Sequence, residues 1–196
     1  MNIGTQFGVE SRHALGKENS VMKNVLVVVD MQKDFVDGSL GTKEAAAIVE
    51  AVVEKVKAFN GEVIFTRDTH FDNYMESQEG KNLPVVHCVK DTEGWELIPE
   101  LKALCEARGS KCYDKPTFGC TVLAEDLKKE YEAGEIASVE LVGLCTDICV
   151  VSNALLIKAF MPELPVSVDS ACCAGVTPEK HEAALETMRS CQISVI

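Results

Sequence analysis

Three side chains that together could cleave an amide bond follow short apolar runs of this sequence: Asp30, Lys115 and Cys149. A cysteine thiolate is a nucleophile, and a neighbouring ammonium or a helix N-terminus lowers the pKa of the thiol. A carboxylate can accept the thiol proton and return it to a leaving nitrogen. We therefore predict Cys149 as the nucleophile, Asp30 as acid and base, and Lys115 as the cation that favours the thiolate. Backbone N–H groups at the turn around Cys145 and Cys149 could stabilise an oxyanion.

A second set of residues has the composition of a metal site: Asp68, His70 and His87. Asp68 and His70 frame a single residue at the end of a β-branched run, so both side chains point to one side of the chain. His87 returns from a long irregular stretch and could complete a three-ligand face with open positions. Imidazole and carboxylate together suit zinc, iron or manganese better than calcium. We expect a single divalent transition metal, zinc in the first place.

Short β-branched runs alternate with longer segments of helical spacing, which predicts a parallel sheet covered by helices. In such a sheet the ligand crevice lies beyond the carboxyl ends of the strands. Each reactive residue taken singly is more often a cap, a solvated charge or core, but their joint placement at successive strand ends favours catalysis. The expected fold is a single-domain, doubly wound, parallel six-stranded α/β sheet with helices on both faces. The expected strands are 25–29, 62–66, 111–113, 138–142, 165–168 and 193–196.

The helices are expected at the segments with capping residues and a period near 3.6. Thr42 can cap a helix that runs to Phe59 and stops at Asn60-Gly61, and Thr177 with Pro178 can start the last one. The long stretch Phe71–Gly94 carries Gly, Pro and polar residues, and loops of that length in compact domains are usually functional. The further helices are expected at 96–108, 121–133, 146–160 and 178–191.

Composition narrows the class of protein. The chain has 196 residues, which suits one compact domain, and a formal net charge of −12 argues against a nucleic-acid or anionic membrane surface. There is no apolar run of about 18 residues and no signal peptide, so we expect a soluble, cytoplasmic protein that binds a small molecule. Nine cysteines, an odd number scattered through apolar segments, predict buried thiols rather than a disulfide framework. Residues 1–21 are interpreted as a leader, tag or flexible arm before a domain at 22–196.

Four segments in order resemble the motifs of the isochorismatase-like cysteine hydrolases, and the resemblance extends from Asn24 onward. In that family the motif aspartate, lysine and cysteine form a catalytic triad, which implies these roles for Asp30, Lys115 and Cys149. The resemblance also implies a cis peptide bond before Cys145 that turns backbone N–H groups into an oxyanion hole. The four segments are Asp30-Met31-Gln32-Lys33-Asp34-Phe35, Thr66-Arg67-Asp68-Thr69-His70, Lys115-Pro116-Thr117-Phe118 and Gly143-Leu144-Cys145-Thr146-Asp147-Ile148-Cys149-Val150.

Cys145 stands where the family pattern has a small residue, often Ala, so we interpret it as a small apolar substitute, with a redox role as the alternative. The other cysteines, including the adjacent Cys172 and Cys173, are expected to pack in the core. His181, among Ala and Leu residues on the last helix, is interpreted as a structural histidine.

The set Asp68, His70 and His87 is similar to that of nicotinamidase-like members, and implies a metal that a ring nitrogen of the substrate could reach. The chain departs from that branch at Thr69, where an aromatic residue is usual, and in the placement of Pro84 before the last His. Some relatives have a Glu as a fourth ligand, for which Glu76 and Glu79 are offset candidates. Phe35, Trp95 and Phe118 are candidates for pocket walls around a flat ring, with core packing as the alternative.

The sequence thus predicts a metal-binding cysteine amidohydrolase that converts a small, nicotinamide-like amide to acid and ammonia through a thioester. A second reading is another isochorismatase-family hydrolase acting on a different amide, carbamoyl or ureido compound. A reading from another class is a metal or redox sensor without turnover. We expect a small amide as the ligand and a homo-oligomer as the assembly.

Overall fold

A computed structural model describes residues 22–196, so the expected leader, tag or arm at 1–21 lies outside the described residues. Its sheet has six strands, all parallel, in the order β3-β2-β1-β4-β5-β6, which confirms the doubly wound α/β fold. The strands are β1 Lys23–Val29, β2 Glu62–Asp68, β3 Cys112–Lys115, β4 Ile136–Leu144, β5 Val166–Ala174 and β6 Ser194–Val195.

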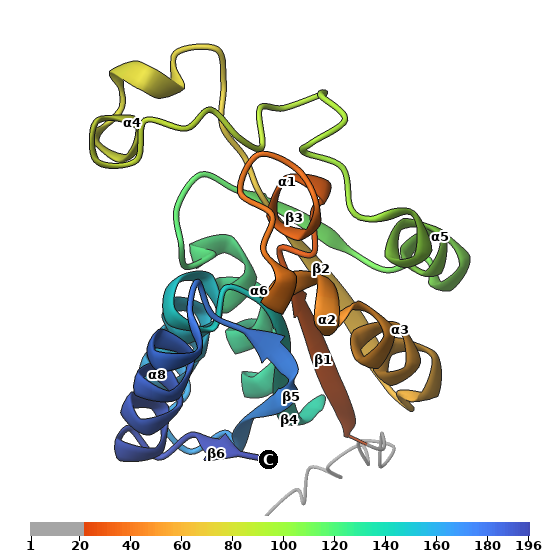
Figure 1. Cartoon of the computed structure of the whole chain (residues 1–196). Coiled ribbons are helices and arrows are strands. Elements are labelled where there is room, and N and C mark those ends of the chain that lie inside the picture. Colours follow the sequence, from red (N-terminus) through yellow and green to blue (C-terminus); the bar gives the residue numbers. More distant parts are fainter. Residues whose placement is uncertain (1–21) are drawn as a thin grey trace, which may run out of the picture.

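Helices cover both faces of the sheet (Figure 1). One face carries α6 Thr121–Glu132, α7 Val151–Phe160 and α8 Pro178–Ser190, and the other carries α2 Lys43–Ala47, α3 Val49–Ala58 and α5 Pro99–Arg108. The central strand β1 shows why: Val25, Val27 and Val29 belong to the core under the first group, while Leu26 and Val28 belong to the core under the second. A strand buried on both faces must be apolar throughout, as this one is.

Several boundaries differ from the expected ones. The helix expected from Thr42 to Phe59 is divided at Ile48, whose backbone (φ −90°, ψ −7°) departs from helical values, although Thr42 does cap its start by accepting the Ala45 N–H at 3.0 Å. The helix expected from Glu96 begins at Pro99, because proline favours the first helical turn. Strand β5 extends beyond its β-branched run through small residues that pair with β4, so it includes the two adjacent cysteines expected after it.

The segment Phe71–Gly94, which we call the lobe, lies beyond the carboxyl ends of the strands (Figure 1). It contains the short helices η1 Tyr74–Glu76 and α4 Gln78–Asn82, while α1 Lys33–Val36 follows β1. Asp34 fixes the base of the lobe, since its Oδ2 accepts the Cys88 N–H at 2.8 Å. Within residues 22–196, no helix combines the length and the apolarity needed to cross a bilayer.

Candidate active site and metal centre

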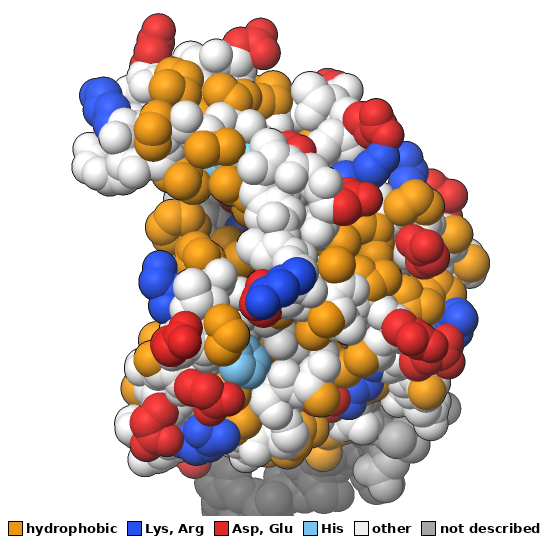
Figure 2. Space-filling model, viewed as in Figure 1, with side chains coloured by type: hydrophobic (Ala, Val, Ile, Leu, Met, Phe, Trp, Pro, Cys, Tyr) orange, Lys and Arg blue, Asp and Glu red, His pale blue; other side chains and the backbone are white. Residues whose placement is uncertain are grey.

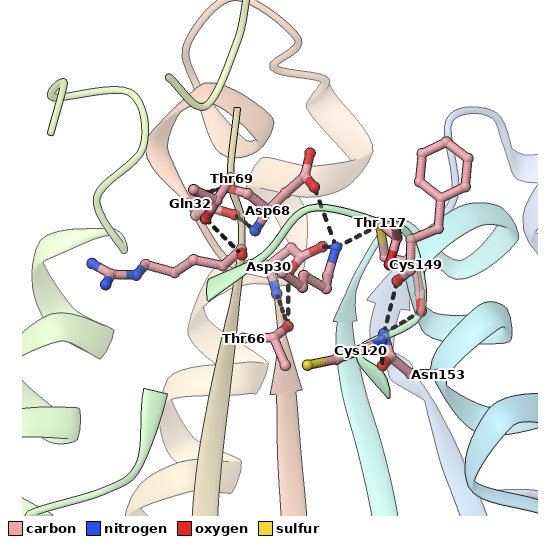
Figure 3. A network of polar contacts seen from close by, with 12 residues as sticks. Asp30, Gln32, Thr66, Asp68, Thr69, Thr117, Cys120, Cys149 and Asn153 are labelled. Carbon is pink, nitrogen blue, oxygen red and sulfur yellow. Dashed lines mark hydrogen bonds and ion pairs between the residues drawn. The ribbon is translucent and has the colours of Figure 1, made fainter. Parts of the chain in front are cut away.

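The three residues expected to share the chemistry meet at the carboxyl edge of the sheet (Figure 3). Nζ of Lys115 lies 2.6 Å from Oδ2 of Asp30 and 3.3 Å from Sγ of Cys149. All three residues are buried. They come from β3, β1 and the turn after β4, so their meeting depends on the order of strands in the sheet.

Asp30 is held by the neighbouring strand β2. Its N–H donates to the backbone oxygen of Thr66 at 3.2 Å, and the Thr66 hydroxyl donates to Oδ1 of Asp30 at 2.7 Å. Asp30 has a φ of +48°, a left-handed conformation that Asp tolerates better than most residues. One carboxylate oxygen thus receives the threonine hydroxyl, while the other faces the Lys115 ammonium.

Cys149 sits in the wide turn η2 Thr146–Val150, which leads from β4 into α7. The Cys145 carbonyl accepts the N–H groups of Ile148 and Val150, and the peptide bond between Leu144 and Cys145 is cis, as the family resemblance implied. Gly143, at φ +114°, allows β4 to pass close to β1, because a Cβ there would lie 2.1 Å from the Val29 oxygen.

The electrostatics of this cluster correct the expectation that the pKa of the Cys149 thiol is lowered. Burial raises the pKa of the Cys149 thiol well above its ordinary value, and the Asp30 carboxylate raises it further, while the Lys115 ammonium acts in the opposite direction. Burial opposes the charge of Lys115, but the carboxylates of Asp30 and Asp68 outweigh it and raise the lysine pKa. Burial likewise raises the pKa of Asp30, against the effect of Lys115. The resting thiol is therefore neutral, beside a buried Asp–Lys ion pair.

The expected metal residues also meet, and Glu79 joins them. The ligand atoms of Asp68, His70, Glu79 and His87 all lie within 4.8 Å of one another. Nε2 of His70 is 3.0 Å from Oδ2 of Asp68 and 3.6 Å from Oε1 of Glu79, and Nε2 of His87 is 3.6 and 3.7 Å from the same two oxygens. Glu76, the other offset candidate, is exposed and lies outside the set.

Backbone pairing brings the two histidines together. The His70 N–H donates to the Cys88 oxygen and the Lys90 N–H donates to the His70 oxygen, both at 2.9 Å, so the end of the lobe runs beside His70. Nδ1 of His87 lies 2.8 Å from the Val85 carbonyl oxygen. Because that oxygen can only accept, Nδ1 donates to it, and Nε2 is directed at the other three residues of the set.

The four residues fit a divalent transition metal. Nε2 of His70 is buried and, although it lies 3.0 Å from Oδ2 of Asp68, makes no well-aligned hydrogen bond among the described residues, a cost that a bound metal would remove. Burial opposes the charge on Asp68, but the contacts with His70, His87 and Lys115 outweigh it and lower the pKa of this carboxyl. Two imidazoles with two carboxylates suit zinc, iron or manganese, whereas calcium favours oxygen ligands.

Both centres open into one cavity of about 690 Å³. Figure 2 shows the hollow between the lobe and the body of the molecule, with hydrophobic side chains gathered around it. Cys149, Asp68 and His87 line the cavity, as do Phe35 and Phe118, two of the three aromatic residues expected as walls.

Trp95 does not line the cavity, so the expectation for this residue is wrong. Its indole N–H donates to the Thr69 hydroxyl at 2.9 Å, and the Arg67 guanidinium stacks on the ring at 3.5 Å from its centre. The side chain is therefore fixed in the loop structure beside β2, away from the cavity lining. Its proximity in sequence to the lobe did not reveal this orientation.

Two buried polar residues that hold the site carried no assigned role in the sequence analysis (Figure 3). Gln32 donates through Nε2 to the backbone oxygens of Asp68 and Trp95, and its Oε1 accepts the Asp68 N–H at 2.7 Å. Asn153 donates to the Cys149 oxygen at 2.8 Å and accepts the Cys120 N–H. Asn153 had a recognisable signal, since it is an amide within an otherwise largely apolar helix.

The family model described as the isochorismatase domain matches residues 24–196, which is nearly the whole of the fold described above. A curated relative, the uncharacterized isochorismatase family protein PncA of Bacillus subtilis (strain 168), is 31% identical over 173 residues, covering 84% of this chain and 93% of its own length. The fold and the site therefore define an isochorismatase-like α/β protein with a candidate metal centre. The chain belongs to the isochorismatase family.

Among solved structures, this chain is similar to nicotinamidase PncA from Bacillus subtilis, with 28% identity, a TM-score of 0.75, and coverage of 89% of this chain and 99% of that one. It is also similar to the pyrazinamidase of Pyrococcus horikoshii in complex with zinc, with 28% identity, a TM-score of 0.71, and coverage of 89% and 98%. A third is N-carbamoylsarcosine amidase from Thermoplasma acidophilum, with 26% identity, a TM-score of 0.70, and coverage of 89% and 95%.

Proposed function

We propose that this chain is a metal-binding cysteine amidohydrolase that converts a small, nicotinamide-like amide to the carboxylic acid and ammonia. The observation that carries the proposal is the position of the Lys115 ammonium, 2.6 Å from Asp30 and 3.3 Å from Cys149, beside a cavity that Cys149 lines. The similarity to structures of a nicotinamidase and a pyrazinamidase supports the choice of an amide with a flat ring.

The first half of the reaction follows from the charges of the cluster. The neutral thiol of Cys149 transfers its proton to the Asp30 carboxylate as Sγ attacks the amide carbonyl, so the negative charge moves from Asp30 to the carbonyl oxygen and the total charge does not change. Lys115 stabilises the sulfur as it becomes negative, because its Nζ lies within 3.3 Å of Sγ. Asp30 then donates the proton to the leaving nitrogen. As the C–N bond breaks, ammonia departs and a thioester forms on Cys149.

The second half reverses the proton path. Asp30 accepts a proton from a water that attacks the thioester carbonyl, and the Cys149 sulfur leaves and regains a proton from Asp30. The products are the carboxylic acid and the original thiol. In both halves the N–H groups at Cys145 and Cys149 are the proposed donors to the tetrahedral oxyanion.

Asp68, His70, Glu79 and His87 would hold the metal at the side of the same cavity. When bound, a divalent metal would supply a positive centre that orients the substrate through a ring nitrogen or through a water that contacts it. The thiol provides the nucleophile, so the chain's own residues carry the bond-breaking steps. Phe35 and Phe118 are the proposed apolar contacts of a flat ring.

Ammonia release from nicotinamide tests the proposal. The protein as purified should release ammonia and nicotinic acid, Cys149→Ala should reduce the rate to background, and Cys145→Ala should keep most of it. Mass spectrometry of the enzyme mixed rapidly with substrate should detect an acyl group on Cys149. Loss of turnover in Cys145→Ala together with near-normal turnover in Cys149→Ala would show that Cys145, and not Cys149, is the nucleophile.

The second candidate is hydrolysis of a carbamoyl or ureido compound, which the similarity to N-carbamoylsarcosine amidase favours. The same triad would attack the ureido carbonyl, and a panel of N-carbamoyl amino acids separates this activity from that on nicotinamide. A protein that binds metal but releases no ammonia from either group would instead be a sensor.

A further inference from the structure

One charged side chain in the wall of the cavity takes no part in the chemistry proposed above. Apart from His87, the acidic and basic residues that line the cavity are Asp68, Glu79 and Lys180. Both carboxylates face the two imidazoles, and Lys180 reaches the cavity wall from the first turn of α8. The amides of Gln78 and Asn82 line the cavity from α4, so no further carboxylate among the lining residues opposes the lysine.

Lys180 is also unusual among the lysines of this acidic chain. Most lysines within residues 22–196 form an ion pair with a carboxylate, and the exceptions are Lys81, Lys158 and Lys180. Lys158 donates to the backbone oxygens of Pro162 and Leu164. Lys81 lies on α4 but does not line the cavity, so Lys180 is the cavity-lining cation without a carboxylate partner among the described residues.

The backbone that carries Lys180 is fastened to the turn that carries the thiol. Oδ1 of Asp147, within that turn, accepts the Val176 N–H at 2.9 Å. The Thr146 hydroxyl lies 2.8 Å from Nδ1 of His181, which confirms the structural interpretation of that histidine. Val176 precedes Lys180 in sequence and His181 follows it. The two contacts therefore fix the position of the Lys180 backbone relative to the turn that carries Cys149.

The size of the cavity points in the same direction. A volume of about 690 Å³ lies within the range that encloses drug-sized ligands, and a single pyridine carboxamide would leave much of it to solvent. The cavity can therefore accommodate a substrate that reaches from the thiol to the lysine.

We propose that Lys180 binds a carboxylate at the distal end of the substrate, so that this enzyme prefers an anionic amide larger than nicotinamide. This inference rests on the amidohydrolase function proposed above and adds the substrate class. An ammonium without a carboxylate partner beside a largely apolar wall favours an anion, and a carboxylate pairs with it through a charge-assisted hydrogen bond.

Binding to the catalytically inert Cys149→Ala variant tests the inference without turnover. The ligands are two matched pairs: adipamic acid and its methyl ester, and 4-carbamoylbenzoate and its methyl ester. Calorimetry should show that at least one carboxylate binds about fivefold more tightly than its ester, the range of a partly exposed charge pair. The preference should decrease with added salt, because salt screens such pairs.

Lys180→Met in the Cys149→Ala background should abolish the preference, whereas Lys81→Met, which removes the same charge from α4 outside the cavity lining, should retain it. Equal binding of acid and ester in both pairs, or a preference that survives Lys180→Met, would overturn the inference. Ammonia release by the unmodified enzyme is measured separately. Carboxylate preference without release from any amide would refute the proposed function alone, and release without preference would refute this inference alone.

Discussion

Asp68 and Lys115 connect the two centres of the site: Oδ1 of Asp68 lies 3.4 Å from Nζ of Lys115, while Oδ2 faces the imidazoles of His70 and His87. One carboxylate therefore faces the candidate metal centre on one side and the Lys115 ammonium on the other. The candidate metal centre and the thiol cluster are therefore in contact through Asp68, a link that the spacing of the motifs does not reveal.

The first prediction separates coupled from uncoupled variants. His87→Ala should remove most of the bound metal while Cys149 still reacts with iodoacetamide within about twofold of the normal rate, because His87 makes no contact with Lys115. Asp68→Asn should reduce metal binding and also change the alkylation rate, since it removes a negative charge beside Lys115. Metal content and alkylation kinetics measure both effects, and an Asp68→Asn protein with normal alkylation would contradict the coupling.

The second prediction concerns the fourth ligand. Glu79→Gln should weaken zinc binding by about tenfold or more, because it removes one charged ligand from a set of four. Glu76→Gln is the matched control, since Glu76 is exposed on the adjacent short helix and lies outside the set. Competition with a zinc chelator gives the two affinities, and equal losses in both variants would indicate a general effect of charge on the lobe.

The third prediction is that Lys115→Met destabilises the fold by about 3–5 kcal/mol, because it leaves the Asp30 carboxylate buried without its ion-pair partner. The Asp30→Asn/Lys115→Met double variant should recover part of that loss in urea unfolding. Lys115 favours the thiolate, so its removal raises the pKa of Cys149, and the rise of the alkylation rate with pH should move to higher pH. An unchanged pH profile in folded Lys115→Met would show that the lysine does not act on the thiol.

The fourth prediction tests Gln32 as a positioning residue. Gln32→Leu should lower the free energy of unfolding by about 2 kcal/mol, because the buried Asp68 N–H loses its acceptor. It should also weaken metal binding, since the backbone that carries Asp68 is no longer fixed. Thr177→Ala, which removes the side-chain cap of α8 and lies outside the cavity lining, should cost about 1 kcal/mol. Its metal affinity should stay normal, and a loss in this control equal to that in Gln32→Leu would show that destabilisation alone explains the effect.

The parallel sheet could be predicted because short β-branched runs alternate with longer segments of helical spacing. The candidate site could be predicted because reactive residues follow these runs. In a parallel sheet, that pattern places Asp30, Lys115 and Cys149 at the same edge, and the order of the strands then brings the three side chains together. The pKa direction of Cys149 could not be predicted, because burial is a property of the packed structure and here exceeds the effect of the lysine. The positions of Glu79 and Trp95 could not be predicted either, because they depend on the path of the lobe. Backbone hydrogen bonds of His70 with Cys88 and Lys90 fix that path.

The strand order has a consequence for protein synthesis. The first strands carry the carboxylates and the lysine, whereas Cys149 follows β4, which enters the sheet beside β1 and not beside β3. A nascent chain that ends before β4 has no thiol at the site and leaves one side of β1 without its partner strand. The site therefore forms only after β4 has been synthesised, and a chain divided at the exposed Gly134 would complete the site only as a reassembled pair of fragments.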